Sequence, residues 1–249
     1  ALGAQTGRSQ APVPKTNALD ALHQRLDRDA DAVLPKVVSL RRDLHQHPEL
    51  GNRETRTSTL LADRLRALGY EVRTGVAKTG VVGILRGGKP GPVVALRSDI
   101  DALPVTEDTG LPFASAARAQ FNGREVGVMH ACGHDFHMAM LMGAAEVLAG
   151  MKTDLSGTVK IIFQPAEEGA PAGEEGGADV MVKEGVLDNP KVDAIFGLHV
   201  GITPLEAGSI SFRPKGIMAA SDTLSITVRG RSTHGAMPWA GVDPIVVSA

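Results

Sequence analysis

Apolar residues recur at helical spacing in three stretches of the chain. The predicted helices cover residues 15–38, 54–68 and 135–148. Pro35 interrupts the first pattern, and Gly69 ends the second, because glycine commonly follows the last turn of a helix. In the third stretch Met138, Leu141 and Leu148 fall on one face, which we expect to belong to the core.

Short runs of apolar, β-branched or aromatic residues predict buried strands. They occupy residues 70–76, 80–86, 92–101, 160–163 and 194–198. Alternating strands and helices predict an α/β fold in which a mostly parallel sheet is flanked by helices. In such a sheet, ligands bind at the carboxyl ends of the strands.

Polar residues stand where three of these strands end. They are Asp99 and Asp101, then Glu167 and Glu168, and finally His199. Because the ends of parallel strands meet at one edge of the sheet, we expect these side chains to share one crevice. The alternative is that the glutamates form a solvated loop and the aspartates only cap a turn.

Cys132 is the only cysteine of the 249-residue chain, so an internal disulfide is excluded. It lies in the segment HACGHDFH (residues 130–137), which concentrates a thiol, imidazoles and a carboxylate. An inert buried thiol beside surface histidines is one interpretation of this segment alone. The acidic residues and His199 expected in the same crevice make a metal site the better interpretation.

The composition argues against nucleic-acid-binding and membrane proteins. With 43% hydrophobic residues, 22% charged residues and a formal net charge of −2, nucleic acids and anionic membranes are not expected as partners. No uninterrupted apolar run is long enough to predict a membrane-spanning helix. His45 and His47 are predicted to be structural, and His137 is predicted to pack or to orient a ligand.

The two ends of the chain differ from its middle. Residues 1–17 are rich in small residues and proline and have no hydrophobic period, which predicts a disordered leader. Such a start suits a mature chain after removal of a secretory signal, so a periplasmic or secreted location is favoured over a cytoplasmic one. Residues 18–214 are predicted to form a metal-binding catalytic domain. Residues 215–249 begin another domain, in which residues 224–228 alternate as in a half-exposed strand.

Seven motifs occur in order along the chain. They are RRDLH with PEL (residues 41–50), DIDALP (99–104), HACGHDFH (130–137), QPAEEG (164–169), EEGGA (174–178), His199 and STHGA (232–236). In this order they resemble a family of two-metal metallopeptidases that comprises hippurate hydrolases, N-acyl-L-amino-acid amidohydrolases and auxin (IAA)-amino acid conjugate hydrolases.

The resemblance implies a site for two divalent metal ions that activate a water for amide hydrolysis. The implied roles are Cys132 as a bridging thiolate, His134 and His199 as ligands of one ion, Glu168 as a ligand of the other, Glu167 as general base, and Asp99 and Asp101 as residues that orient ligands. Zinc or manganese is expected, with cobalt or nickel as alternatives.

The resemblance also implies a lid. Residues 215–249 would begin an α+β domain, truncated in this chain, that is inserted into the catalytic domain and forms a homodimer. His234 is then expected to act as a second catalytic residue that stabilises the oxyanion in the partner's active site. The rest of the lid and one last metal-binding histidine are expected beyond Ala249.

The implied reaction is hydrolysis of the amide bond of a small N-acyl amino acid or peptide, which releases a carboxylic acid and a free amino acid. A dipeptidase or carboxypeptidase of the same two-metal type is an alternative, and so is a non-catalytic metal-binding homologue. A further alternative is an enzyme that uses Cys132 as its nucleophile, but such an enzyme would give Glu167, Glu168 and His199 no evident role.

Overall fold

The computed structural model describes residues 16–201, 206–212, 214–216 and 224–249. Contacts between residues divide the chain into two compact units, Ala1–Val200 and Gly201–Ala249, and each is described by itself. The predicted leader falls almost entirely on residues 1–15, outside the described residues. The predicted domain limits at residues 17 and 214 stay predictions.

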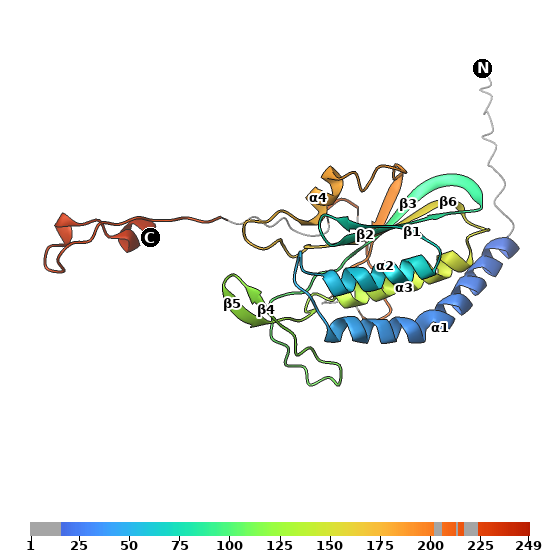
Figure 1. Ribbon diagram of the computed structural model, residues 1–249, viewed down its shortest axis with the longest axis horizontal. Helices are drawn as coiled ribbons and strands as arrows, with labels where there is room; N and C mark the ends of the chain where they lie inside the picture. The colour runs from blue at the N-terminus through green and yellow to red at the C-terminus, as the bar shows by residue number, and fades with distance from the viewer. Residues whose placement is uncertain (1–15, 202–205, 213, 217–223) are drawn as a thin grey trace, which may run out of the picture. The chain divides into compact units, whose positions relative to one another are not determined.

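The first unit is built around a five-stranded sheet with the order β1-β2-β6-β3-β7 (Figure 1). Its strands are β1 (Glu71–Val76), β2 (Gly80–Arg86), β3 (Lys89–Asp99), β6 (Ser156–Gln164) and β7 (Ala194–Gly197). β3 is parallel to β6 and β7, whereas β2 is antiparallel to β1 and β6. Four of the five strands therefore point the same way, which confirms the mostly parallel sheet.

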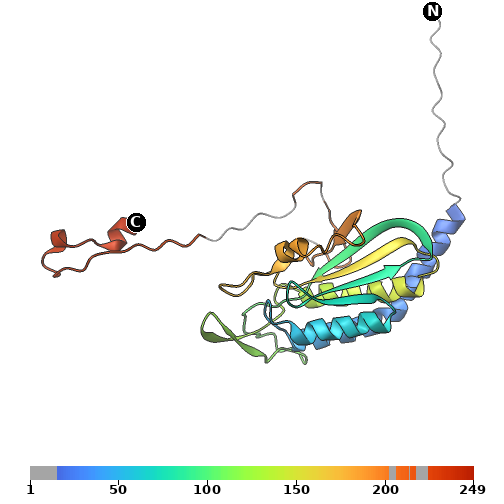
Figure 2. The same cartoon turned by 45° about the horizontal axis from the view of Figure 1, so that its top comes forward.

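Helices cover both faces of this sheet (Figures 1 and 2). They are α1 (Thr16–Gln46), α2 (Thr55–Ala67) and α3 (His134–Gly150) on one face and α4 (Gly177–Lys183) on the other. Neighbouring residues of β6 alternate between the two cores, because Ile161 and Phe163 pack with the three long helices while Ile162 packs with Met181 of α4. No helix among the described residues is both long enough and apolar enough to cross a membrane.

Helix α1 corrects the prediction that Pro35 interrupts the pattern near residue 38, since it runs through Pro35 as far as Gln46. Proline removes one backbone hydrogen bond and disfavours a helix interior. Packing outweighs this cost, because Leu40 and Leu44, which follow the proline, are buried in the core shared with α3.

Beyond the proline, α1 is tied to the start of α3 by a buried polar group. Nδ1 of His45 lies 2.8 Å from Oδ2 of Asp135, and Nε2 lies 3.1 Å from Oε1 of Glu107. Nε of Arg41 lies 2.7 Å from the same Asp135 oxygen. His45 is 3% exposed, so its role is structural, as expected from the sequence. His47, just after α1, is exposed, and its ring contacts Asp43 of that helix.

A short hairpin that was not predicted follows β3. It consists of β4 (Arg118–Phe121) and β5 (Arg124–Gly127), which pair antiparallel. Its turn residues Asn122 and Gly123 have φ of 50° and 75°, the values that a tight hairpin turn requires. The Asn-Gly pair was a signal in the sequence that could have identified this hairpin.

The strands end side by side at one edge. In the register of the sheet, Asp99 of β3 pairs with Gln164 of β6, and Arg97 of β3 pairs with Gly197 of β7. The residues that follow these positions therefore emerge close together, which is the arrangement that the strand pattern predicts.

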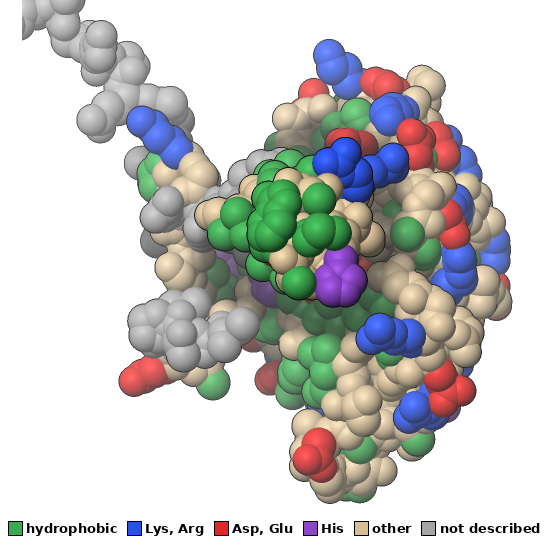
Figure 3. Space-filling view, turned by 90° about the vertical axis from the view of Figure 1, so that its left-hand side faces the viewer, with side chains coloured by type: hydrophobic (Ala, Val, Ile, Leu, Met, Phe, Trp, Pro, Cys, Tyr) green, Lys and Arg blue, Asp and Glu red, His purple; other side chains and the backbone are tan. Residues whose placement is uncertain are grey.

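The second unit contains only short elements among its described residues. These are a 3₁₀ turn, η1 (Pro238–Ala240), a helix, α5 (Pro244–Ser248), and a bridge between Arg231 and Val242. The predicted strand at residues 224–228 is not formed. Alternation makes a strand only when a neighbouring backbone offers hydrogen-bond partners, and the described residues offer none to this segment. Apolar side chains of this unit stay on its surface (Figure 3), among them Trp239, which is 78% exposed.

Candidate metal centre

The turn before α3 requires a glycine between Cys132 and His134. Gly133 has φ of 91°, in the left-handed region that favours glycine. A Cβ atom at this position would lie 2.4 Å from Cγ2 of Val200. Because Val200 follows His199, the same close approach brings a second histidine to this turn.

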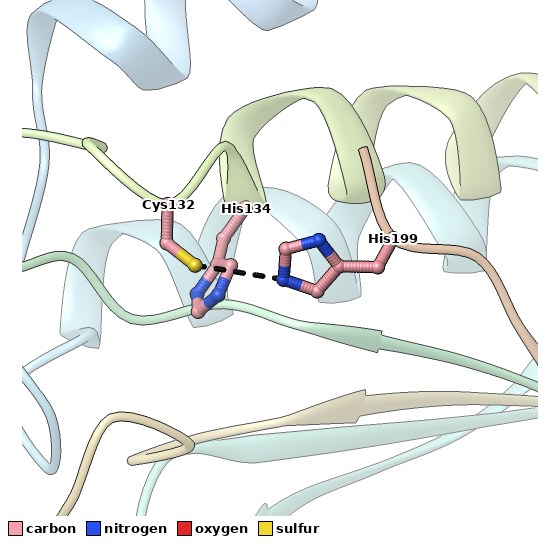
Figure 4. Close-up of side chains that lie close together, drawn as sticks. All are labelled: Cys132, His134 and His199. Carbon is pink, nitrogen blue, oxygen red and sulfur yellow. Dashed lines mark hydrogen bonds between the residues drawn. The ribbon is translucent and has the colours of Figure 1, made fainter. Parts of the chain in front are cut away.

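Cys132, His134 and His199 converge in this place (Figure 4). The Sγ atom of Cys132 lies 3.5 Å from Nε2 of His199. One potential ligand atom from each of the three residues lies within 4.8 Å of the other two. They form the first ligand group.

Hydrogen bonds determine which nitrogen of each ring is free. Nδ1 of His134 lies 2.8 Å from the carbonyl oxygen of Asp101, and Nδ1 of His199 lies 2.8 Å from the carbonyl oxygen of Val200. A carbonyl only accepts, so Nδ1 carries a hydrogen in both rings, and in the neutral form of each ring the lone pair is on Nε2. Nε2 of His134 is buried and has no hydrogen-bond partner. In their neutral form both rings therefore offer Nε2 as the nitrogen that can bind a metal ion.

Glu167 and Glu168 approach the same nitrogen. Nε2 of His134 lies 3.6 Å from Oε2 of Glu167 and 3.8 Å from Oε1 of Glu168. These three residues form the second ligand group, which shares His134 with the first. Both glutamates follow the end of β6, and their side chains are 38% and 26% exposed. A ligand can therefore reach them from solvent.

His137 lies one turn after His134 on α3 but has both nitrogens occupied. Its Nδ1 donates to Oδ1 of Asp99 at 2.7 Å, and its Nε2 accepts from the backbone N–H of Val200 at 2.9 Å. Asp99, His134 and His137 are close enough to form a third ligand group. Because His137 is already used, its part is to hold Asp99 and the backbone beside His199.

Arg97 contacts the site although sequence reasoning did not single it out. Its Nη1 donates to Oδ2 of Asp99 at 2.7 Å, and its Nε and Nη2 donate to Oε1 of Gln164 at 2.9 and 2.7 Å. Burial alone would raise the pKa of Asp99, but the hydrogen bond from His137 and the charges of His134 and Arg97 hold it at about 2. An arginine inside a buried strand pattern was the signal that could have identified this partner.

Asp101 links the two ligand groups. Besides its carbonyl bond to His134, its Oδ2 accepts from the backbone N–H of Glu168 at 2.9 Å. It is 1% exposed. Asp101 therefore fixes the orientation of the His134 ring and the course of the chain at Glu168.

The structure brings seven of the eight predicted site residues together. They are Asp99, Asp101, Cys132, His134, Glu167, Glu168 and His199. The eighth, His234, lies in the second unit, where its Nδ1 accepts from the backbone N–H of Ala236 at 3.1 Å.

Comparison with known proteins identifies the family. Residues 95–247 match the model of peptidase family M20/M25/M40. The chain belongs to this family. Thermostable carboxypeptidase 1 of Saccharolobus solfataricus is 44% identical over 228 residues, which cover 91% of this chain and 54% of that protein. N-acyl-L-amino acid amidohydrolase of Geobacillus stearothermophilus is 40% identical over 226 residues, with 91% and 57% covered.

A solved structure supports the fold. The YXEP protein of Bacillus subtilis, described as a dinuclear metal binding peptidase from the M20 family, is 44% identical with a TM-score of 0.58. The match covers 68% of this chain and 43% of that chain. The resemblance found in the sequence motifs is thereby confirmed. This M20 chain spans about half the length of the curated relatives it matches.

The electrostatics of the M20 site favour a cation. Burial, together with the carboxylates of Glu168 and Glu167, raises the pKa of Cys132 to about 12, so the thiol is neutral near pH 7 without a cation. A nucleophilic cysteine requires the opposite shift, which argues against Cys132 as a nucleophile. Burial also raises the pKa of Glu167, against the attraction of His134, and a raised value suits a general base.

The donor set fits two metal ions. The first group offers a thiol and two imidazole nitrogens, and the second offers two carboxylates beside the unpartnered Nε2 of His134. Sulfur, nitrogen and oxygen donors in this combination suit zinc and related divalent ions. The buried Nε2 atom, which no protein group satisfies, is the specific sign that a ligand belongs here.

Proposed function

We propose that the protein is a metal-dependent amidohydrolase that converts N-acyl amino acids to a carboxylic acid and a free amino acid. The observation that carries this proposal is the pair of ligand groups that meet at His134, the second of which contains Glu167. The 40% identity to an N-acyl-L-amino acid amidohydrolase supports the substrate class.

In this proposal, which follows the family resemblance, Cys132 would serve both ions as thiolate, His134 and His199 would complete the protein ligands of one ion, and Glu168 would bind the other. Two such ions supply a water of lowered pKa and stabilise negative charge on the amide oxygen. Asp101 keeps His134 and Glu168 in place through its two hydrogen bonds. Asp99 does so less directly, by fixing His137.

Glu167 is the proton carrier. It takes a proton from the attacking water and passes it to the departing amine, so that the amino acid leaves as a neutral amine. Its raised pKa, caused first by burial, brings the carboxylate nearer to the value at which it accepts and releases a proton near neutral pH.

The proposal includes four finer points. The ions are zinc or manganese, with cobalt or nickel able to use the same donors. The protein forms a homodimer through the second unit, and His234 of one subunit stabilises the oxyanion in the other. A periplasmic or secreted location, favoured over a cytoplasmic one, is the fourth point.

A carboxypeptidase is the second candidate. The 44% identity to thermostable carboxypeptidase 1 favours it. Both reactions cleave an amide bond next to an amino acid, so the same centre serves either.

The test is a substrate panel measured together with metal content. The purified protein is loaded with zinc, manganese, cobalt or nickel and offered N-acetyl amino acids, N-benzoyl amino acids and peptides. The proposal predicts release of a free amino acid from the acyl substrates that stops after chelation. Preference for peptides would select the carboxypeptidase, and turnover that survives chelation would exclude both candidates.

A further inference from the structure

The turn that carries Glu167 and Glu168 rests on a buried carboxylate from another part of the chain. Glu54, just before α2, is 0% exposed. Its Oε1 accepts from the backbone N–H of Ala166 at 2.9 Å, and its Oε2 accepts from the hydroxyl of Thr79 at 2.6 Å. One side chain thus joins α2, the β1–β2 turn and the residue before Glu167.

Ala166 needs such support because its backbone is in an unfavourable conformation. Its φ is 48°, in the left-handed region that residues with a Cβ atom rarely adopt. Ala166 is 4% exposed, so its N–H has no access to water if Glu54 is lost. A strained conformation of this kind persists only where surrounding contacts determine it.

The Glu167–Glu168 turn is held at two points. Glu54 binds the N–H of Ala166, and Asp101 binds the N–H of Glu168 at 2.9 Å. Glu167 lies between the two bonds. Its direction is therefore set by two buried carboxylates, neither of which belongs to the two ligand groups.

Residues next to Glu54 also hold the loop of residues 166–176 at a second position, Glu174. Glu174 accepts from Arg53 at 2.5 Å, from Lys78 at 2.5 Å and from Asn52 at 3.1 Å. This gives the EEGGA motif a structural role that its sequence alone did not reveal. The segment of residues 51–54 and the loop of residues 166–176 therefore form one assembly.

Glu54 is free for this role because another residue caps α2. Glu49 accepts from the backbone N–H of Arg56 at 3.0 Å and from that of Thr57 at 2.8 Å, whereas the Glu54 side chain makes no cap bond to the helix. The two glutamates are five residues apart, and each accepts from backbone N–H groups. Only Glu54 reaches the site.

We propose that Glu54 is a positioning residue that sets the geometry of Glu167 and Glu168 at the metal centre through Ala166. Loss of a residue that orients ligands typically reduces metal affinity or activity about 10–100-fold. The expected loss of kcat rests on the proposed function. The expected change in the geometry of the metal centre does not.

Cobalt ion is the probe, because visible absorption of Co²⁺ reports the geometry of its ligands without turnover. Glu54→Met removes both acceptors at similar size, and Glu54→Gln keeps an oxygen for Ala166 and offers an N–H to the Thr79 oxygen. Glu49→Met is the matched control. We expect Glu54→Met to change the cobalt spectrum and lower kcat about 10–100-fold with KM within about threefold. Glu54→Gln should restore both, and Glu49→Met should lower Tm without changing the spectrum.

An unchanged cobalt spectrum in Glu54→Met, with a loss of Tm like that of Glu49→Met, would overturn the inference. So would Glu54→Gln behaving like Glu54→Met. If Glu54→Met does not fold, Thr79→Val decides: a changed spectrum supports the role and an unchanged one refutes it. If the parent protein hydrolyses no amide, the proposed function fails while the spectra still decide the role of Glu54.

Discussion

The Nδ1 atom of His134 lies 2.8 Å from the backbone carbonyl oxygen of Asp101, and this bond directs the other nitrogen to the metal centre. Because the carbonyl requires a hydrogen on Nδ1, Nε2 is the nitrogen that faces Glu167 and Glu168, and it has no hydrogen-bond partner. The chemistry proposed for the site depends on this atom.

Glu167→Gln should reduce kcat about 10²–10⁴-fold, the usual contribution of a general acid–base group, while metal content stays unchanged. Steady-state kinetics and elemental analysis test this together. Glu168→Gln is the neighbouring control and should lose metal. Metal loss in Glu167→Gln with only a small loss of rate would mean that the two roles are exchanged.

The pKa of Cys132 leads to a pH-dependent prediction for the metal-free protein. A thiol reacts as thiolate, and a pKa raised to about 12 keeps the thiolate fraction small at pH 8. Alkylation by iodoacetamide after chelation should therefore be slow at pH 8 and rise about tenfold per pH unit through pH 10. A plateau below pH 9 would show that the thiol ionises normally. Bound metal should protect Cys132 at every pH.

His45→Ala should destabilise the protein by about 1–3 kcal/mol, because it removes one hydrogen-bond partner from each of the carboxylates of Asp135 and Glu107. Arg41 still contacts Asp135, and the backbone N–H of Ser115 still donates to Glu107. Urea unfolding measures this change. His47→Ala, two residues away and exposed, should change the free energy of unfolding by no more than about 0.5 kcal/mol. Equal effects of the two substitutions would show that the contacts of His45 with Asp135 and Glu107 do not stabilise the fold.

His234→Ala should lower kcat about 100-fold or more if His234 is an oxyanion donor. Mixing this variant with Glu167→Gln, after subunit exchange, tests whether it acts across a dimer. Recovery of part of the activity is expected, because one site of each mixed dimer then has both intact residues. A mixture that exchanges subunits and stays inactive would contradict the trans role.

The sequence predicted the parts of the fold that depend on local pattern. Polar residues placed after buried strands indicated the edge at which Asp101, Glu167 and His199 meet, because parallel strands end together. The passage of α1 through Pro35 depends instead on packing between distant segments. Residues 224–228 had the pattern of a strand but lack a partner among the described residues.

The site was predicted less completely than the fold, since supporting contacts have no local signature. From the sequence alone, Glu54 is simply the first residue of a predicted helix. Its contact with Ala166 joins positions 112 residues apart, so no local pattern predicts it. The contact of Arg97 with Gln164 likewise forms only because β3 pairs with β6, although its partner Asp99 is just two residues away on β3. Such residues are identified by burial and hydrogen bonding, which need the folded chain.

The most direct test is a titration of the chelated full-length protein, including the histidine expected beyond Ala249, with zinc or manganese, while hydrolysis of an N-acyl amino acid is followed at each step. We predict no activity without metal, a maximum near two ions per chain, and no recovery in His134→Ala, because His134 belongs to both ligand groups. Activity that persists after chelation, or that His134→Ala retains, would contradict this prediction.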